Sequence, residues 1–232
     1  MRFYSSFVLF IIVMNCCNNT ALAGGIQIAR TRVIYNAEKK EAALPIINKD
    51  AELPWLIQSW VDTGDGKTRG PFIITPPLFR LDAQSEQSLR IILAGDTLPQ
   101  DRESLMFINV RTIPASDKTD EANNVLRLIY KTRLKLFYRP KGLQGLPADA
   151  CKTLSFSRTG NTLRVKNPAR YYVVFDSLYL GKGLVKDADT VAPGGEVALT
   201  LADPAGARDV SWRCITDYGN ASTRNNGRLD QG

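Results

Sequence analysis

The chain has no histidine among its 232 residues. Nucleophilic Ser–His and Cys–His pairs are therefore excluded, and so are metal sites with histidine ligands at the usual spacings. No glycine-rich phosphate loop precedes a helical pattern. Carboxylate pairs such as Asp101 and Glu103 are the remaining candidates for acid–base chemistry, and such residues are far more often surface or ion-paired groups. These absences favour a binding function over catalysis, and they predict that the protein uses no cofactor and no metal ion.

Cysteine is scarce, with 4 residues in the whole chain. Two of them, Cys16 and Cys17, lie in an apolar N-terminal segment, which leaves Cys151 and Cys214. A single remaining pair in an exported protein predicts one disulfide, with two buried free thiols as the alternative. A bridge that closes a loop of about sixty residues would stabilise the fold by about 4 kcal/mol in the chain-entropy model.

Long hydrophobic runs are also missing, apart from Phe7–Met14 near the N-terminus. This run is too short for a membrane-spanning helix, which needs about 20 apolar residues. A basic Arg2 precedes it, and the small-residue ending "ALA" at residues 21–23 follows it. The layout predicts a signal peptide over residues 1–23 that is cleaved on export, with an uncleaved anchor as the alternative. The rest of the sequence predicts no membrane insertion.

Acidic residues are outnumbered, because 30 lysines and arginines face 23 aspartates and glutamates and give a net charge of +7. The basic residues are dispersed along the chain rather than clustered, so the charge does not favour nucleic acid as a partner. For an exported protein, this balance predicts a protein partner that carries acidic groups.

Beyond residue 23 the sequence consists mostly of short period-two patterns separated by turn residues, which predicts an all-β fold of the sandwich type. The chain is long enough for two sandwiches of about 100 residues each. The motif "RPKG" at residues 139–142 interrupts the pattern, because proline cannot continue a strand ladder and glycine permits a bend. We therefore expect two domains, residues 24–140 and 141–232, with a polar tail that frays from Asn220 onward.

The stretch "NVLRLIYKTRLKLFYRP", residues 124–140, alternates almost without a break and predicts one strand over about residues 124–138. Most strands have only about 5–6 residues. One face is apolar and the other is largely basic; the apolar face carries Leu126, Leu128, Tyr130, Thr132, Leu134, Leu136 and Tyr138. The simplest interpretation is that the apolar face packs into the protein's own core, which leaves the length of the strand unexplained.

The block "LPQDRESLMFINVRTIP", followed by "IYKTRLKLFYRP", resembles the periplasmic pilus chaperones of the bacterial chaperone–usher pathway. The segments "ARTRVIY", "ITPPLFRL", "NPARYYV" and "DYGN" agree, so the resemblance covers nearly the whole chain beyond residue 23. The short connection at residues 115–123 is similar to that of the short-loop subclass. The resemblance implies two immunoglobulin-like β-sandwiches in an L, or boomerang, arrangement.

The resemblance also implies a use for the long strand. In this family a pilus subunit lacks the last strand of its own sandwich, and the chaperone fills the open groove with its long edge strand. The residues expected to enter the groove are Leu126, Leu128 and Tyr130, whereas Leu134 and Leu136 are expected in the chaperone's own core. Without the resemblance, packing of the whole face into the protein's own core stays the alternative.

Two charged sets are implied in the same way. Arg32 and Lys135 match the cations that bind the C-terminal carboxylate of the subunit, and Glu103, Arg139 and Asp217 match an interdomain salt-bridge cluster. Taken alone, the first two would be solvated cations on strands, and the other three would be unrelated surface charges.

The resulting prediction is a non-enzymatic chaperone of the periplasm. It would fold and cap pilus, or fimbrial, subunits in a one-to-one complex and deliver them to an outer-membrane usher, without ATP or any other cofactor. The alternative is a secreted adhesive or structural β-sandwich protein that binds glycans through its basic face. An enzyme, in the form of a carboxylate-based hydrolase, is a distant third.

Overall fold

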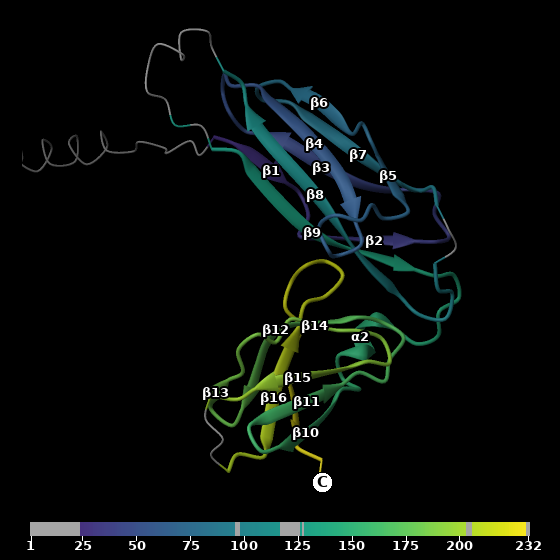
Figure 1. The fold of residues 1–232 in the computed structure, drawn as a ribbon, viewed down its shortest axis with the longest axis vertical. Coiled ribbons are helices and arrows are strands. Elements are labelled where there is room, and N and C mark those ends of the chain that lie inside the picture. The colour runs from purple at the N-terminus through teal and green to yellow at the C-terminus, as the bar shows by residue number, and fades with distance from the viewer. Residues whose placement is uncertain (1–23, 96–97, 117–125, 127, 203–205, 231–232) are drawn as a thin grey trace, which may run out of the picture.

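The structure is a computed structural model that describes residues 24–95, 98–116, 126, 128–202 and 206–230 (Figure 1). The signal peptide predicted over residues 1–23 lies outside these ranges, as does most of the connection predicted at 115–123. In the described part of the chain, no helix is long and apolar enough to cross a membrane.

Two β-sandwiches make up the described chain, and Figure 1 shows them set at an angle to each other. The prediction of an all-β fold with two sandwiches is therefore confirmed. The last strand of the first sandwich ends at Arg139, and the short helix α2 (Pro147–Ala150) precedes the strands of the second. The boundary predicted after residue 140 falls in this interval, and the limits of the two domains stay a prediction.

The first sandwich packs a four-stranded sheet against a five-stranded one. The smaller sheet has the order β1 (Ile26–Ile28), β3 (Ala42–Asn48), β7 (Glu86–Leu93), β5 (Phe72–Thr75). The larger sheet has the order β2 (Arg32–Asn36), β9 (Tyr130–Arg139), β8 (Ser104–Pro114), β4 (Trp55–Asp62), β6 (Leu78–Leu81). Alternate residues of these strands meet between the sheets in one apolar core, which includes Leu44, Ile57, Leu89, Ile108 and Leu136.

The N-terminal strands contribute to both sheets of the first sandwich. β1 pairs antiparallel with β3, whereas β2 crosses over and pairs parallel with β9. The chain changes sheets within residues 29–31, between the two strands. As a result, Arg32 begins β2 directly opposite Lys135 of β9.

The second sandwich is built from one three-stranded sheet and one larger sheet. The first has the order β10 (Ser155–Thr159), β11 (Thr162–Lys166), β15 (Glu196–Thr200). The second has the order β13 (Gly183–Leu184), β12 (Val173–Leu180), β16 (Asp209–Cys214), β17 (Asn225–Arg228), with β14 (Thr190–Val191) also paired to β12.

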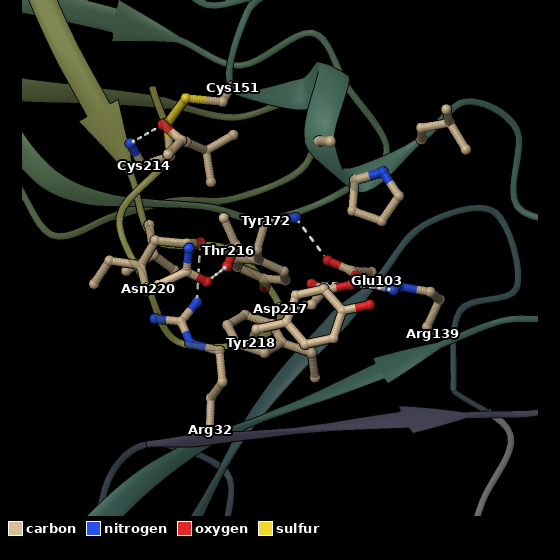
Figure 2. Close-up of a pocket in the computed structure, with 18 residues that line it drawn as sticks. Arg32, Glu103, Arg139, Cys151, Tyr172, Cys214, Thr216, Asp217, Tyr218 and Asn220 are labelled. Carbon is tan, nitrogen blue, oxygen red and sulfur yellow. Dashed lines mark hydrogen bonds and ion pairs between the residues drawn. A yellow bond between two sulfur atoms is a disulfide. The ribbon is translucent and has the colours of Figure 1, made fainter. Parts of the chain in front are cut away.

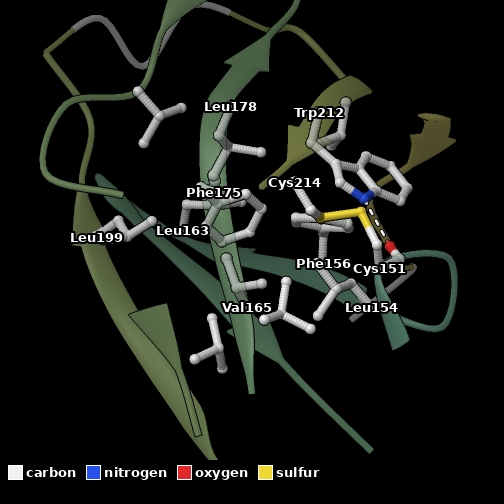
Figure 3. Close-up of a cluster of buried hydrophobic side chains, with 14 of the residues drawn as sticks. Cys151, Leu154, Phe156, Leu163, Val165, Phe175, Leu178, Leu199, Trp212 and Cys214 are labelled. Carbon is white, nitrogen blue, oxygen red and sulfur yellow. Dashed lines mark hydrogen bonds between the residues drawn. A yellow bond between two sulfur atoms is a disulfide. The ribbon is translucent and has the colours of Figure 1, made fainter. Parts of the chain in front are cut away.

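The predicted disulfide between Cys151 and Cys214 is present and lies at the edge of the core of the second sandwich (Figure 3). It ties the residue that follows α2 to the last residue of β16. Beside it, the indole Nε1 of Trp212 donates a hydrogen bond of 2.7 Å to the carbonyl oxygen of Cys151. The bridge therefore fixes the point from which the chain leaves β16 towards the first sandwich.

The expectation of a frayed tail from Asn220 is wrong for most of the tail. Residues 225–228 form β17, which pairs antiparallel with β16 from Asp209 to Trp212. A polar segment can form a strand here because β16 offers an unpaired edge that satisfies its backbone groups. Gly227 lies against the Trp212 ring, where an added Cβ would come within 3.2 Å of a ring carbon.

The long strand is shorter than the sequence predicts. β9 begins at Tyr130, not at Asn124, and Leu126, Leu128 and Ile129 are described outside any strand. The other residues between 124 and 127 lie outside the described part of the chain. The physical reason is the length of the partner: the last pair of the β8–β9 ladder joins Thr112 to Tyr130, and β8 ends two residues later at a proline.

Candidate functional site

One edge of β9 is only half covered. On one side β8 pairs with the strand along most of its length, from Tyr130 to Tyr138. On the other side β2 pairs only with residues 135–139. Among the described residues, the backbone of residues 130–134 therefore has no strand partner on the β2 side. An unpaired strand edge of this kind is a template for another strand.

The apolar face of β9 changes from exposed to buried along this edge. Leu126, Leu128 and Tyr130 have 84%, 52% and 55% of their surface exposed. By contrast, Leu134 and Leu136 are 3% and 0% exposed and belong to the core of the first sandwich. The structure thus places the three residues predicted to enter a groove outside the core, whereas later residues of the same alternating pattern lie inside it.

Arg32 and Lys135 mark the point where the half-covered edge ends. They are register partners on neighbouring parallel strands, so both side chains leave the same face of the sheet. Lys135 Nζ lies 2.7 Å from Asp189 Oδ1 of the second sandwich, and the lysine side chain is 21% exposed. The structure therefore brings together the two cations that were predicted as a pair.

Arg32 is poorly satisfied for a buried cation. The residue is 8% exposed, its Nη1 donates a long hydrogen bond of 3.4 Å to the carbonyl oxygen of Ile215, and its Nε is buried without a partner. Burial lowers the pKa of Arg32, although the charges of Asp217 and Asp189 partly counteract this effect. A buried guanidinium with unused donors is a site that gains from a bound anion.

Glu103, Arg139 and Asp217 form one contact network across the two sandwiches (Figure 2). Arg139 Nε lies 2.7 Å from Glu103 Oε1, and its Nη1 and Nη2 donate to the two oxygens of Asp217 at 2.8 and 3.0 Å. Burial alone would lower the pKa of Arg139, but the two carboxylates outweigh it and raise the pKa above its ordinary value. The guanidinium is therefore held as a cation between the first and second sandwich.

A cavity of about 380 Å³ lies between the two sandwiches, and Figure 2 shows the side chain of Arg32 rising from β2 into it. Its wall includes the apolar side chains Phe137, Tyr172, Val174, Ile215 and Tyr218. The disulfide also contributes to the wall, next to the segment that carries Ile215 and Asp217. The cavity thus combines an apolar surface with two arginines, the buried Arg32 and the ion-paired Arg139. Lys135 lies outside its wall, opposite Arg32 on β9, and we call the cavity together with Lys135 the cleft. Among the described residues, no group of three or more histidine, cysteine, aspartate or glutamate side chains could hold a metal ion.

Sequence reasoning did not find Asp189. It lies 54 residues from Lys135 along the chain, directly before the short strand β14, and no motif marks it as a partner of the lysine. Only the packing of the second sandwich against the first brings the two charges together, so no spacing in the sequence could have indicated the contact.

Two family models match the chain along nearly its whole described length. Residues 25–144 match the pili and flagellar-assembly chaperone, PapD N-terminal domain, and residues 149–226 match the pili assembly chaperone PapD, C-terminal domain. Among curated proteins, the chain is 43% identical over 205 residues to the probable fimbrial chaperone LpfB of Escherichia coli O157:H7, covering 87% of this chain and 88% of that protein.

Solved structures give the same result. The complex of Salmonella enterica SafA pilin with the SafB chaperone contains a chain that matches with a TM-score of 0.82 and 33% identity, covering 89% of this chain and 97% of that one. The periplasmic chaperone SfaE matches with a TM-score of 0.76 and 36% identity, covering 88% of this chain and 100% of that one.

Proposed function

This chain belongs to the PapD family of pilus-assembly chaperones, and we propose that it caps pilus subunits by pairing them with the free edge of β9. As a family member it is a folding and assembly chaperone and not an enzyme. We place its action in the periplasm, because SfaE is a periplasmic chaperone and the sequence predicts a signal peptide over residues 1–23. The named relatives are chaperones, which favours subunit assembly over the adhesive alternative.

The half-covered edge of β9 is the observation that carries the proposal. A subunit that lacks its last strand has an open apolar groove, and a donated strand fills it through backbone hydrogen bonds and alternate side chains. Residues 130–134 offer the unpaired backbone, and Leu126, Leu128 and Tyr130 offer the exposed apolar side chains. In this complex β9 would lengthen towards residue 124, because the subunit supplies the partner that β8 no longer provides. The SafA–SafB complex is a precedent for a chaperone of this fold bound to a pilin.

Arg32 and Lys135 supply the anchor for the end of the bound chain. A strand that pairs with residues 130–134 runs into the first residue of β2, which is Arg32. A terminal carboxylate at this point would accept charge-assisted hydrogen bonds from both cations, including the unused Nε of Arg32. Fixing one end also fixes the register of the pairing, which matters because a slip of one residue turns every side chain to the opposite face.

The network of Glu103, Arg139 and Asp217 has a supporting role in this proposal. It joins the sandwiches beside the cavity and keeps the Ile215–Asp217 segment opposite Arg32. The capped subunit would then pass to an outer-membrane usher, where the next subunit replaces the chaperone strand by strand exchange. Such an exchange trades one set of backbone hydrogen bonds for another and needs no nucleotide.

The test is co-purification of tagged chaperone with the pilins encoded beside it, expressed together in the periplasm. We expect a one-to-one complex for the wild type and loss of the pilin with Leu128→Asp or Lys135→Ala. Matched controls are Leu184→Asp, on the exposed strand β13 of the second sandwich, and Lys152→Ala, whose ammonium pairs with Asp149 of α2. Pilin recovery at the wild-type level with both Leu128→Asp and Lys135→Ala would contradict strand donation, and incorporation of the protein into the fibre would instead support the adhesive alternative.

A further inference from the structure

Lys135 is already paired with a carboxylate of its own chain. Asp189 Oδ1 lies 2.7 Å from Lys135 Nζ, in the place where the proposed function requires the carboxylate of the subunit. The aspartate comes from the second sandwich and the lysine from the first, so the contact links the two sandwiches at the register partner of Arg32. An ion pair at a ligand site implies that the ligand must either bind elsewhere or displace the resident partner.

The position of Asp189 is fixed by its backbone. Its carbonyl oxygen accepts a hydrogen bond of 2.7 Å from the N–H of Phe175, and the next residue, Thr190, pairs with Val174 of β12. The backbone that carries the carboxylate is therefore held beside β12, directly before β14. Its side chain is 68% exposed, however, so it can turn away into solvent without leaving a buried charge.

The neighbouring carboxylate could not serve in the same way. The charge of Asp217 also raises the pKa of Arg32, but both oxygens of Asp217 accept hydrogen bonds from Arg139. Releasing Asp217 would take two hydrogen bonds from Arg139, whose side chain is only 17% exposed. Of the two carboxylates whose charges act on Arg32, Asp189 is thus the one that can be displaced at low cost.

The balance of contacts favours displacement by a bound chain end. An exposed ion pair contributes little to stability, because water and salt screen it. Arg32 has one long hydrogen bond and an unused Nε. A terminal carboxylate placed between the two cations would exchange one weak contact for charge-assisted bonds to both of them.

From this geometry we propose that Asp189 is an internal substitute for the subunit's terminal carboxylate, and that it weakens subunit binding by competing for Lys135. The inference rests on the proposed function of the cleft. In the free chaperone Asp189 neutralises Lys135, and in the complex it is displaced. When the subunit leaves, Asp189 returns to the lysine, so the chaperone's own chain partly offsets the loss of the contact and makes release easier.

The test measures binding of a synthetic peptide that copies the C-terminal strand of the co-purified pilin. The peptide is made as the free acid and as the amide, and its dissociation constant is measured by calorimetry for full-length wild type and Asp189→Asn. The matched control is Asp209→Asn, an exposed aspartate of the second sandwich that pairs with Arg228 far from the cleft cations. We expect Asp189→Asn to bind the free acid about threefold more tightly, to bind the amide unchanged, and the control to equal the wild type.

The two peptide forms separate the two claims. Unchanged or weaker binding of the free acid by Asp189→Asn, with wild type still preferring acid to amide, overturns the role of Asp189 and leaves the carboxylate anchor intact. Equal binding of acid and amide by the wild type overturns the anchor itself. An equal gain for both peptide forms would show that Asp189 acts through the angle between the sandwiches rather than by competition, and would also overturn the inference.

Discussion

Glu103 accepts a hydrogen bond of 2.8 Å from the backbone N–H of Tyr172, so a carboxylate of the first sandwich holds the main chain of the second. The other oxygen of the same carboxylate contacts Arg139 at the end of β9. A return contact runs from the backbone N–H of Glu103 to the carbonyl oxygen of Arg170 at 2.9 Å. The relative placement of the sandwiches therefore depends on directional bonds as well as on apolar packing.

Replacing the central cation of this network should be costly. Arg139→Gln leaves Glu103, whose side chain is 2% exposed, without its charged partner, and we expect a loss of about 3 kcal/mol in the free energy of unfolding. Glu103→Gln should cost less, because Arg139 keeps both bonds to Asp217. Urea denaturation measures the stability, and solution scattering measures the angle between the sandwiches. Equal stability of the two variants, with an unchanged scattering profile, would contradict the role of the network; Arg80→Gln, at an exposed ion pair, is the control.

Because Asp62 is a buried, hydrogen-bonded carboxylate, we expect the protein to lose stability in acid. Burial alone would raise the pKa of this carboxyl, but hydrogen bonds outweigh burial and hold the pKa below its usual value; the donors are Asn109 Nδ2, the Gly64 N–H and Arg133 Nη2. A lowered pKa means that the unfolded chain takes up the proton first, so the contribution of Asp62 is present above about pH 4 and is lost as the pH falls.

The variant Asp62→Asn isolates this contribution. At neutral pH it should be less stable than the wild type, and the difference should shrink as the pH falls towards the lowered pKa of Asp62. Urea midpoints over a pH series measure the trend, with Asp82→Asn, 70% exposed, as the control. A difference that stays constant over the series would show that titration of Asp62 does not contribute.

The disulfide should stabilise the second sandwich. Cys151 and Cys214 are 63 residues apart, and in the chain-entropy model a loop of this size contributes about 4 kcal/mol. We expect the double variant Cys151→Ser and Cys214→Ser to lower the unfolding temperature of the second sandwich in calorimetry and to leave the first sandwich unchanged. The wild type treated with a reducing agent should behave in the same way. Coincident unfolding of both sandwiches at the original temperature would refute this prediction.

Leu128, which precedes β9, and Leu136, which lies within it, should respond differently to truncation. Leu136→Ala empties a fully buried position and should cost about 2–5 kcal/mol of stability. Leu128→Ala removes a half-exposed side chain and should change stability by no more than about 0.5 kcal/mol, while it weakens pilin capture. Denaturation and co-purification of both variants measure the two effects. A large stability loss with Leu128→Ala would mean that this residue packs into the chaperone's own core.

Local pattern predicted much of the fold. Alternation along β9 placed Leu134 and Leu136 in the core, and the count of cysteines was enough to predict the bridge between Cys151 and Cys214. The limits of β9 could not be read from its own residues, because a strand ends where its partner ends, and here the partner is β8. For the same reason, the polar β17 became a strand only through the open edge of β16.

The residues of the candidate site also differ in whether the sequence could predict them. The segments around Arg32, Glu103, Lys135, Arg139 and Asp217 stand out through resemblance to a family, and the structure brings these side chains to one cleft. Asp189 carries no such signal. Its contact with Lys135 depends on how the two sandwiches pack, which is a property of the whole chain and not of any segment.

The crossover of β2 has a further consequence. Because β2 covers β9 from Lys135 onward, any strand added to the open part of β9 meets a fixed stop at Arg32. The cleft would act as a length gauge that measures every subunit from its last residue, whatever the sequence of its groove. One extra residue at the end of a subunit would turn its side chains to the wrong face, and two would turn them back.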